Sequence, residues 1–230
     1  MIIISNKNIR FSIFTHIEKC AGMSLCKLFD IHKNNQFNDL EKRHNTIQDD
    51  IHIMNKFFKK IDINQILFFT CLRNPWDRML SFYHYIKQLN IDKNYPHWSK
   101  YHEICKKKTF TDFILYANDY PQFIGACKTY KKRLMYKKYF LCDYIINFHN
   151  IYSDIIYLKN IFSIPKKLSI MNSSNHKLYK TYYNSKTIDI VKNIFNEDIE
   201  FFNFCFEKTN QIRKPPTNYG KIDSLIYKNI

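Results

Sequence analysis

Three residues near the start of the chain have the types and spacing of an anion-binding loop. Lys19, Gly22 and Ser24 follow an apolar run over residues 11–17 that is rich in β-forming side chains, and apolar residues recur at helical spacing after it. A turn from a strand into a helix presents unpaired N–H groups and the positive end of the helix dipole to an anion. Gly22 is one of only three glycines, and glycine suits a turn that needs positive φ or close approach to a ligand. The pattern therefore predicts a loop that binds a phosphate-like group, with Lys19 as its cation.

This loop is not the Walker A loop of nucleotide-binding proteins, which needs a second glycine and a Gly-Lys-Ser/Thr ending. In this chain the lysine comes three residues before the glycine. A plain strand-to-helix turn with a surface lysine is compatible with the same residues. The loop taken alone therefore leaves both interpretations open.

A second basic residue follows a second predicted strand. The segment Gln65 to Leu72 is a continuous apolar run of the kind found in buried parallel strands. Arg73 comes next, Asn74 is a good helix N-cap, and Pro75 suits the first helical position. Ligands of open α/β sheets bind at the carboxyl ends of the strands. We therefore expect Lys19 and Arg73 to lie at the ligand-binding edge of such a sheet.

Hydrophobic periodicity predicts the remaining elements, and their alternation predicts an α/β protein. With no internal repeat and no linker, we expect a single domain over residues 1–230, with a core over about 10–206 and a tail over 207–230. The other predicted segments are a helix over 49–61, an irregular basic stretch over 91–108, a short helix over 110–116, a strand over 138–148, a helix over 151–162 and one long amphipathic helix over 187–206.

The composition favours a folded, basic protein with an anionic partner. Hydrophobic residues make up 45% of the 230 residues and aromatic residues 17%, which argues against an intrinsically disordered chain. The net charge of +16 favours a nucleotide, an acidic glycan, nucleic acid or a membrane surface as partner. The lysines form no long basic tail, so we expect no nucleic-acid-binding arm. Solubility alone also accounts for such a charge.

The cysteines and the start of the chain bear on the compartment. The seven cysteines are scattered and include no CxxC pair, so no metal or redox motif is predicted and a reducing compartment is the simpler expectation. The first residues lack the apolar core of a signal peptide, and no run of about 18 apolar residues follows. We therefore expect no membrane span and a cytoplasmic location, although an anchor removed from the natural protein is compatible with this sequence.

Two segments resemble the donor-binding motifs of carbohydrate-type sulfotransferases, in particular those of the uronyl and heparan 2-O type. Thr15 to Leu25 (Thr-His-Ile-Glu-Lys-Cys-Ala-Gly-Met-Ser-Leu) resembles their phosphosulfate-binding loop, usually His-Ile-Pro-Lys-Thr-Ala-Gly-Thr-Ser. Phe69 to Tyr83 (Phe-Thr-Cys-Leu-Arg-Asn-Pro-Trp-Asp-Arg-Met-Leu-Ser-Phe-Tyr) resembles their 3′-phosphate-binding element, Val-Arg-Asn-Pro-x-x-Arg-x-x-Ser-x-Tyr. Segments of the carboxyl half fit as well, so the resemblance covers roughly residues 10–206. Either motif alone is a weak signal, but the two in order are a strong one.

The resemblance implies a P-loop-like three-layer α/β fold with a central parallel sheet flanked by helices. It also implies an enzyme that binds 3′-phosphoadenosine 5′-phosphosulfate (PAPS), transfers its sulfuryl group to a hydroxyl of a carbohydrate acceptor, and releases the product PAP. In such an enzyme Arg73 binds the 3′-phosphate, helped by Ser81 two helical turns further on, and Lys19 neutralises charge that grows on the leaving phosphate. The residues that would bind the 5′-phosphosulfate are Lys19, Cys20, Ala21, Gly22, Met23, Ser24 and Leu25.

The transfer also needs a base that takes the proton of the acceptor hydroxyl, and histidine is the side chain best suited to this near neutral pH. Related sulfotransferases place a histidine between the two motifs, commonly in a Lys-His-x-Thr context, and here Lys42-Arg43-His44-Asn45-Thr46 fits that position, with His44 as the base. An exposed loop histidine is the alternative interpretation. No metal is required. The acceptor is expected to be an anionic carbohydrate or another hydroxyl compound, and no nucleic-acid partner is expected.

Two other functions are compatible with parts of the sequence. A nucleotide kinase on a related scaffold is disfavoured because the Gly-Lys-Ser/Thr ending is missing. A catalytically degenerate sulfotransferase fold that binds anionic glycans or nucleotides without transfer is favoured by departures from the motifs. Glu18 replaces a proline, Cys20 and Met23 replace threonines, and residues 147–150 replace Arg-Phe-Glu-Asn.

Overall fold

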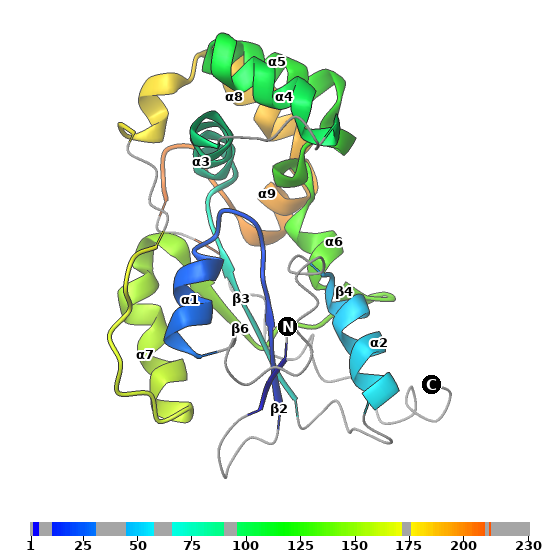
Figure 1. Ribbon diagram of the computed structural model, residues 1–230, viewed down its shortest axis with the longest axis vertical. Helices are drawn as coiled ribbons and strands as arrows, with labels where there is room; N and C mark the ends of the chain where they lie inside the picture. Colours follow the sequence, from blue (N-terminus) through cyan, green and yellow to red (C-terminus); the bar gives the residue numbers. More distant parts are fainter. Residues whose placement is uncertain are drawn as a thin grey trace. The chain divides into compact units, whose positions relative to one another are not determined.

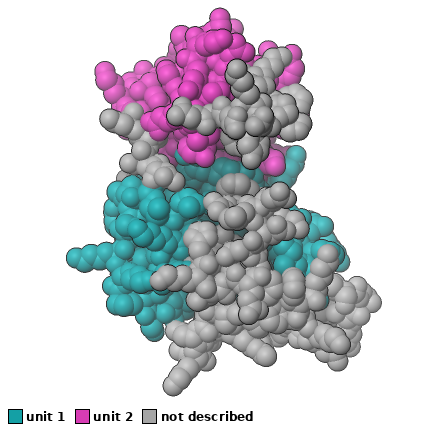
Figure 2. All heavy atoms as spheres, viewed as in Figure 1, with its two compact units in different colours: residues 1–72, 130–171, 214–230 teal, residues 73–129, 172–213 magenta. Residues whose placement is uncertain are grey.

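The computed structural model describes residues 2–4, 11–30, 45–57, 66–89, 96–171, 176–209 and 212 (Figure 1). These residues form two compact units, which Figure 2 distinguishes by colour. The first contains the described residues up to Leu72 together with Tyr130–Met171, and the second contains Arg73–Thr129 and the described residues from 176 onwards. A single domain over 1–230 stays a prediction.

The first unit contains the strands β1 (Ile2–Ile4), β2 (Phe11–Thr15), β3 (Ile66–Leu72), β4 (Met135–Tyr136), β5 (Tyr139–Phe140) and β6 (Tyr144–Asn147), the helices α1 (Gly22–Leu28), α2 (Ile47–Phe57), α6 (Tyr130–Leu134) and α7 (Ile151–Ile161), and the 3₁₀ turn η5 (Phe148–Asn150). The second unit contains α3 (Pro75–Gln88), α4 (Pro96–Lys107), α5 (Phe110–Asp119), α8 (Ser185–Ile194) and α9 (Asn196–Phe202), with the 3₁₀ turns η3 (Pro121–Phe123), η4 (Gly125–Cys127) and η6 (Tyr179–Tyr182).

The sheet of the first unit has the strand order β1-β2-β3-β6, in which β2, β3 and β6 are parallel and β1 is antiparallel to β2. The register pairs Thr15 with Thr70 and Leu72 with Asn147, so the parallel strands end at one edge. The β3 strand lies between two parallel neighbours and is buried along nearly its whole length, which explains its continuous apolar sequence.

Aromatic side chains join this sheet to the helices on one of its faces. Phe14 and Phe69 contact each other across β2 and β3 with ring centroids 5.2 Å apart. Phe69 also contacts Phe29, at the end of α1, and Phe162, at the end of α7, at 5.4 and 5.9 Å. Figure 1 shows α1 and α7 on this side and α2 on the other. The prediction of an α/β fold with a parallel sheet flanked by helices is therefore confirmed.

The segment 138–148, predicted as one strand, forms two. β5 pairs only with β4 in a short hairpin, and β6 joins the main sheet, with residues 141–143 between them. Asp143 causes the break, because its backbone N–H donates to the Phe68 carbonyl while its carboxylate accepts from the Phe68 N–H, both at 2.8 Å. Burial raises the pKa of this carboxyl group. The prediction was wrong because a polar residue inside an apolar run bonds to the neighbouring strand.

In the second unit, two helix predictions need correction. Residues 91–108 were predicted to be irregular, but α4 spans most of them and buries Cys105. The 187–206 segment was predicted as one helix, but α8 ends at Ile194 and α9 begins at Asn196. Phe195 between them is fully buried, so core packing decides where the first helix ends. Among the described helices, none is long and apolar enough to cross a bilayer.

Candidate functional site

The loop between β2 and α1 has an unusual backbone. Lys19 and Ala21 are both in the left-handed region, with φ of 63° and 57°, which is costly for residues other than glycine and is common at functional sites. The Cys20 N–H donates to the Ile17 carbonyl at 3.3 Å, and the Leu25 N–H donates to the Ala21 carbonyl at 3.0 Å. The loop thus turns tightly and delivers the chain into α1. The Leu25 amide serves the helix, and its role in binding an anion stays a prediction.

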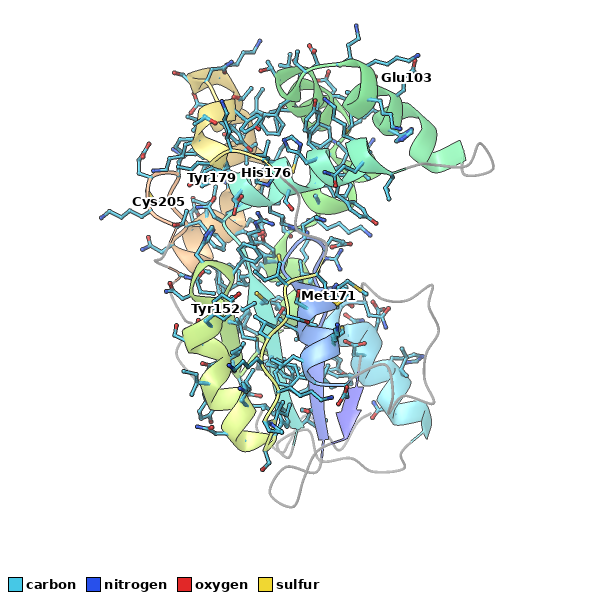
Figure 3. All side chains as sticks on the ribbon, turned by 60° about the vertical axis from the view of Figure 1, so that its left-hand side comes forward. Glu103, Tyr152, Met171, His176, Tyr179 and Cys205 are labelled. Carbon is cyan, nitrogen blue, oxygen red and sulfur yellow. The ribbon has the colours of Figure 1, made fainter. Side chains whose placement is uncertain are left out.

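The first turn of α1 retains donors for an anion. Helix geometry leaves the earliest N–H groups without an acceptor in the same helix, and in α1 these belong to Gly22, Met23 and Ser24. Ala21 is the N-cap and has no side-chain oxygen to accept from them. The Ser24 hydroxyl is buried and accepts from the Met171 N–H at 2.9 Å, so it also anchors the segment after α7. Figure 3 shows Met171 beside α1.

Gly22 is required for a packing reason that the sequence did not indicate. A Cβ at this position would overlap the imidazole ring of His16. His16 is buried, and its ring stacks on Phe14 with centroids 6.0 Å apart. The ring therefore lies against the backbone at the start of α1. The φ of Gly22 is not positive, so close approach rather than backbone freedom explains the glycine.

Two of the substituted loop positions, Glu18 and Cys20, have partners within the same unit. The Glu18 carboxylate forms a two-pronged ion pair with Arg133 of α6, with Nη2 2.6 and 2.7 Å from its two oxygens. The Cys20 thiol is buried and lies 3.8 Å from the Tyr130 hydroxyl, also on α6. Glu18 therefore directs its carboxylate to an arginine that lies 115 positions away in sequence.

Arg73 follows the last residue of β3 and begins the second half of the predicted site. Its Nε and Nη2 atoms donate to the two carboxylate oxygens of Asp77 at 2.7 and 2.9 Å. Asn74 caps α3 by accepting from the Trp76 N–H at 3.1 Å, and Pro75 is the first helical residue, both as predicted. The Arg73–Asp77 pair is almost fully buried, which fixes the plane of the guanidinium.

Ser81 and two tyrosines complete this region of the second unit. Ser81 lies on α3 and is 3% exposed. Burial raises the pKa of Tyr183 and of Tyr179, and the Asp77 carboxylate raises both further. The Tyr183 hydroxyl donates to the Trp76 carbonyl at 2.8 Å. Both phenols therefore stay protonated near neutral pH and donate hydrogen bonds. The Tyr183 hydroxyl holds the start of α3, and the Tyr179 hydroxyl donates to the Phe206 carbonyl.

The predicted residues thus fall into two groups, each described within its own unit. Lys19, Cys20, Gly22 and Ser24 belong to the loop and helix start of the first unit. Arg73 and Ser81 belong to the second. His44, the predicted base, lies outside the described residues. Among the described residues, no cluster of three or more His, Cys, Asp or Glu side chains has the arrangement of a metal site.

Asp77 and Arg133 were not among the predicted site residues. Asp77 follows Arg73 by four positions at the start of a helix, a spacing at which opposite charges pair, so the sequence contained this signal. Arg133 contacts Glu18 only through the tertiary fold, and no local pattern indicates it.

The family model described as the sulfotransferase family matches residues 3–205. Searches of curated proteins and of solved structures returned no match. The matched range includes the loop after β2, Arg73 and Ser81, so the resemblance inferred from the two motifs is confirmed: the chain belongs to the sulfotransferase family.

Proposed function

We propose that this sulfotransferase takes the sulfuryl group from PAPS and transfers it to a hydroxyl of a carbohydrate acceptor. The observation that supports this most directly is the loop after β2, where a lysine and unpaired helix N–H groups stand in a segment matched by the family model. A phosphosulfate presents several anionic oxygens, and such donors bind them at short range.

The chain's residues have separate roles in this proposal. The loop from Lys19 to Ser24 binds the 5′-phosphosulfate, and Lys19 stabilises the charge that develops on the bridging phosphate oxygen. Arg73 binds the 3′-phosphate with the help of the Ser81 hydroxyl. Because Asp77 holds one edge of the Arg73 guanidinium, the orientation of this side chain is set before the ligand arrives.

The chemical step is an in-line displacement at sulfur. The acceptor oxygen forms a new S–O bond while the S–O bond to the 5′-phosphate breaks, and PAP leaves. His44 acts as the general base and takes the proton of the acceptor hydroxyl. The net charge of +16 favours an acidic carbohydrate as acceptor.

The first test measures ligand-induced stabilisation and transfer. A ligand that binds only the folded state raises its stability by RT ln(1 + [L]/Kd). We expect PAP to raise the melting temperature and ATP–Mg to raise it less. Labelled PAPS should then transfer sulfate to at least one member of a panel of acidic glycans. Equal shifts with both nucleotides would contradict the donor assignment, and binding without transfer would favour the degenerate fold.

Variants test the roles of individual residues. Arg73→Lys replaces the paired N–H donors of the guanidinium with a single ammonium group. We therefore expect PAP to bind about tenfold to a hundredfold more weakly, while 5′-AMP, which lacks the 3′-phosphate, binds as before. Lys19→Ala should weaken the binding of both PAP and 5′-AMP.

The His44→Ala variant should bind PAP normally, but its rate of sulfuryl transfer should fall about 10²- to 10⁴-fold. The exposed Lys27 of α1 provides the matched control, and Lys27→Ala should change none of these values.

A further inference from the structure

Helix α6 contacts both sequence neighbours of Lys19. Its Arg133 forms the ion pair with Glu18, and its Tyr130 lies against the thiol of Cys20. These two residues are three positions apart, so they lie on one face of the helix. The loop is therefore held on either side of Lys19 by side chains that come from one short element.

The ion pair is largely removed from solvent. The Arg133 side chain is 3% exposed and that of Glu18 13%. Because little water surrounds this carboxylate to screen its charge, it acts strongly on nearby charges. Glu18 is bonded directly to Lys19, so an unpaired carboxylate here would attract Lys19 and repel an anionic ligand. Arg133 supplies the charge that cancels it.

We propose that Arg133 is a positioning residue for the donor: by neutralising Glu18, it keeps the loop net positive towards an anion. The proposal rests on the proposed function. The formal charges of Glu18, Lys19 and Arg133 are −1, +1 and +1 and sum to +1. Without Arg133 the sum is zero, and without both Glu18 and Arg133 it is again +1. The proposal therefore states that the net charge of the loop, rather than the ion pair itself, sets the affinity for PAP.

The test compares three variants by titration with PAP, and the unfolding of each is measured in parallel. Arg133→Gln removes one charge, and we expect PAP affinity to fall about tenfold or more at low salt and less at high salt. Glu18→Gln/Arg133→Gln restores the charge sum, and affinity should return to within about threefold of wild type. Arg133→Lys keeps the charge but replaces the planar guanidinium with an ammonium group, and it should also bind PAP within about threefold of wild type.

Two features keep the result unambiguous. Lys132→Gln removes one exposed charge from the same helix, and it should bind PAP as wild type does. If Arg133→Gln fails to fold, the double variant and Arg133→Lys still distinguish the charge proposal from rigid support by the ion pair. If either of them binds PAP more than about tenfold more weakly than wild type, rigid support explains the pair and the charge proposal is overturned.

The proposed function can fail separately. If the wild-type protein does not bind PAP, the donor assignment is wrong, and the same variants are then titrated with inorganic pyrophosphate. Loss of pyrophosphate binding in Arg133→Gln, with recovery in the double variant, would support the role of Arg133 on its own. Absence of pyrophosphate binding by the wild-type protein would overturn both proposals.

Discussion

Single residues around the loop after β2 are constrained by direct contact. Gly22 and His16 are the clearest example, because the imidazole ring lies where a Cβ of residue 22 would be. The ring is buried and stacked on Phe14, so it has little room to move. This contact defines how the chain enters α1, where the candidate anion donors begin.

We therefore expect Gly22→Ala to destabilise the protein by about 1–3 kcal/mol, the cost of overpacking a well-filled site. In a His16→Ala background the same substitution should cost much less, since the overlapping ring is gone. Denaturant unfolding of the four proteins in this double-mutant cycle measures the difference. A cost that is equal in both backgrounds would show that the ring does not explain the glycine.

At the scale of elements, the second unit holds the segment before η6 against α3 through two histidines. The rings of His84, on α3, and His176 stack with centroids 5.0 Å apart, and Tyr182 of η6 meets His84 edge-on at 5.5 Å. Figure 3 labels His176 and Tyr179 in this region. Burial lowers the pKa of His84, and the neighbouring His176 and Lys87 lower it further.

This shift predicts a pH dependence with a definite sign. Because the pKa of His84 is lower in the folded state, protonation favours the unfolded state, and stability is lost as pH falls below the ordinary histidine value of about 6.5. We expect the free energy of unfolding to decrease between about pH 7.5 and about pH 5.5. His84→Gln should flatten this dependence. His52→Gln, at an exposed histidine of α2, should leave it unchanged, and a slope that survives His84→Gln would exclude His84 as its source.

At the scale of the whole molecule, the reactivity of the cysteine thiols can be used to follow the unfolding of each unit. Burial raises the pKa of Cys105 and of Cys127 to about 12, so neither thiol is reactive near neutral pH. Cys26 and Cys71 of the first unit are buried as well, whereas Cys205 is exposed. None of the seven cysteines, all of which the structure describes, is joined in a disulfide.

We expect a thiol reagent at about pH 8 to label Cys205 at once and the buried cysteines only as the protein opens. Cys105 and Cys127 should share one labelling rate, and Cys26 and Cys71 should share another, because the two pairs belong to different compact units. Mass spectrometry of digested samples gives each rate. A single rate for all four would mean that the units open as one.

The sequence predicted well what depends on local pattern. The two strands before Lys19 and Arg73, the Asn74 cap and the family all followed from residue order and spacing. It failed where packing decides, as in the 138–148 strand that Asp143 divides and the helix that ends before Phe195. The partner of Glu18 could not be predicted, because the ion pair joins residues 115 positions apart.

The pairing of Arg73 with Asp77 bears on inhibitor chemistry. A ligand that reaches this guanidinium meets a cation whose charge is already shared with a carboxylate. If Arg73 binds the 3′-phosphate as proposed, replacing that phosphate with a neutral hydrogen-bond acceptor should lower the affinity less here than at an arginine without an acidic partner. On that proposal, nucleotide analogues with an uncharged group in place of the 3′-phosphate are the starting point for inhibitors of this sulfotransferase.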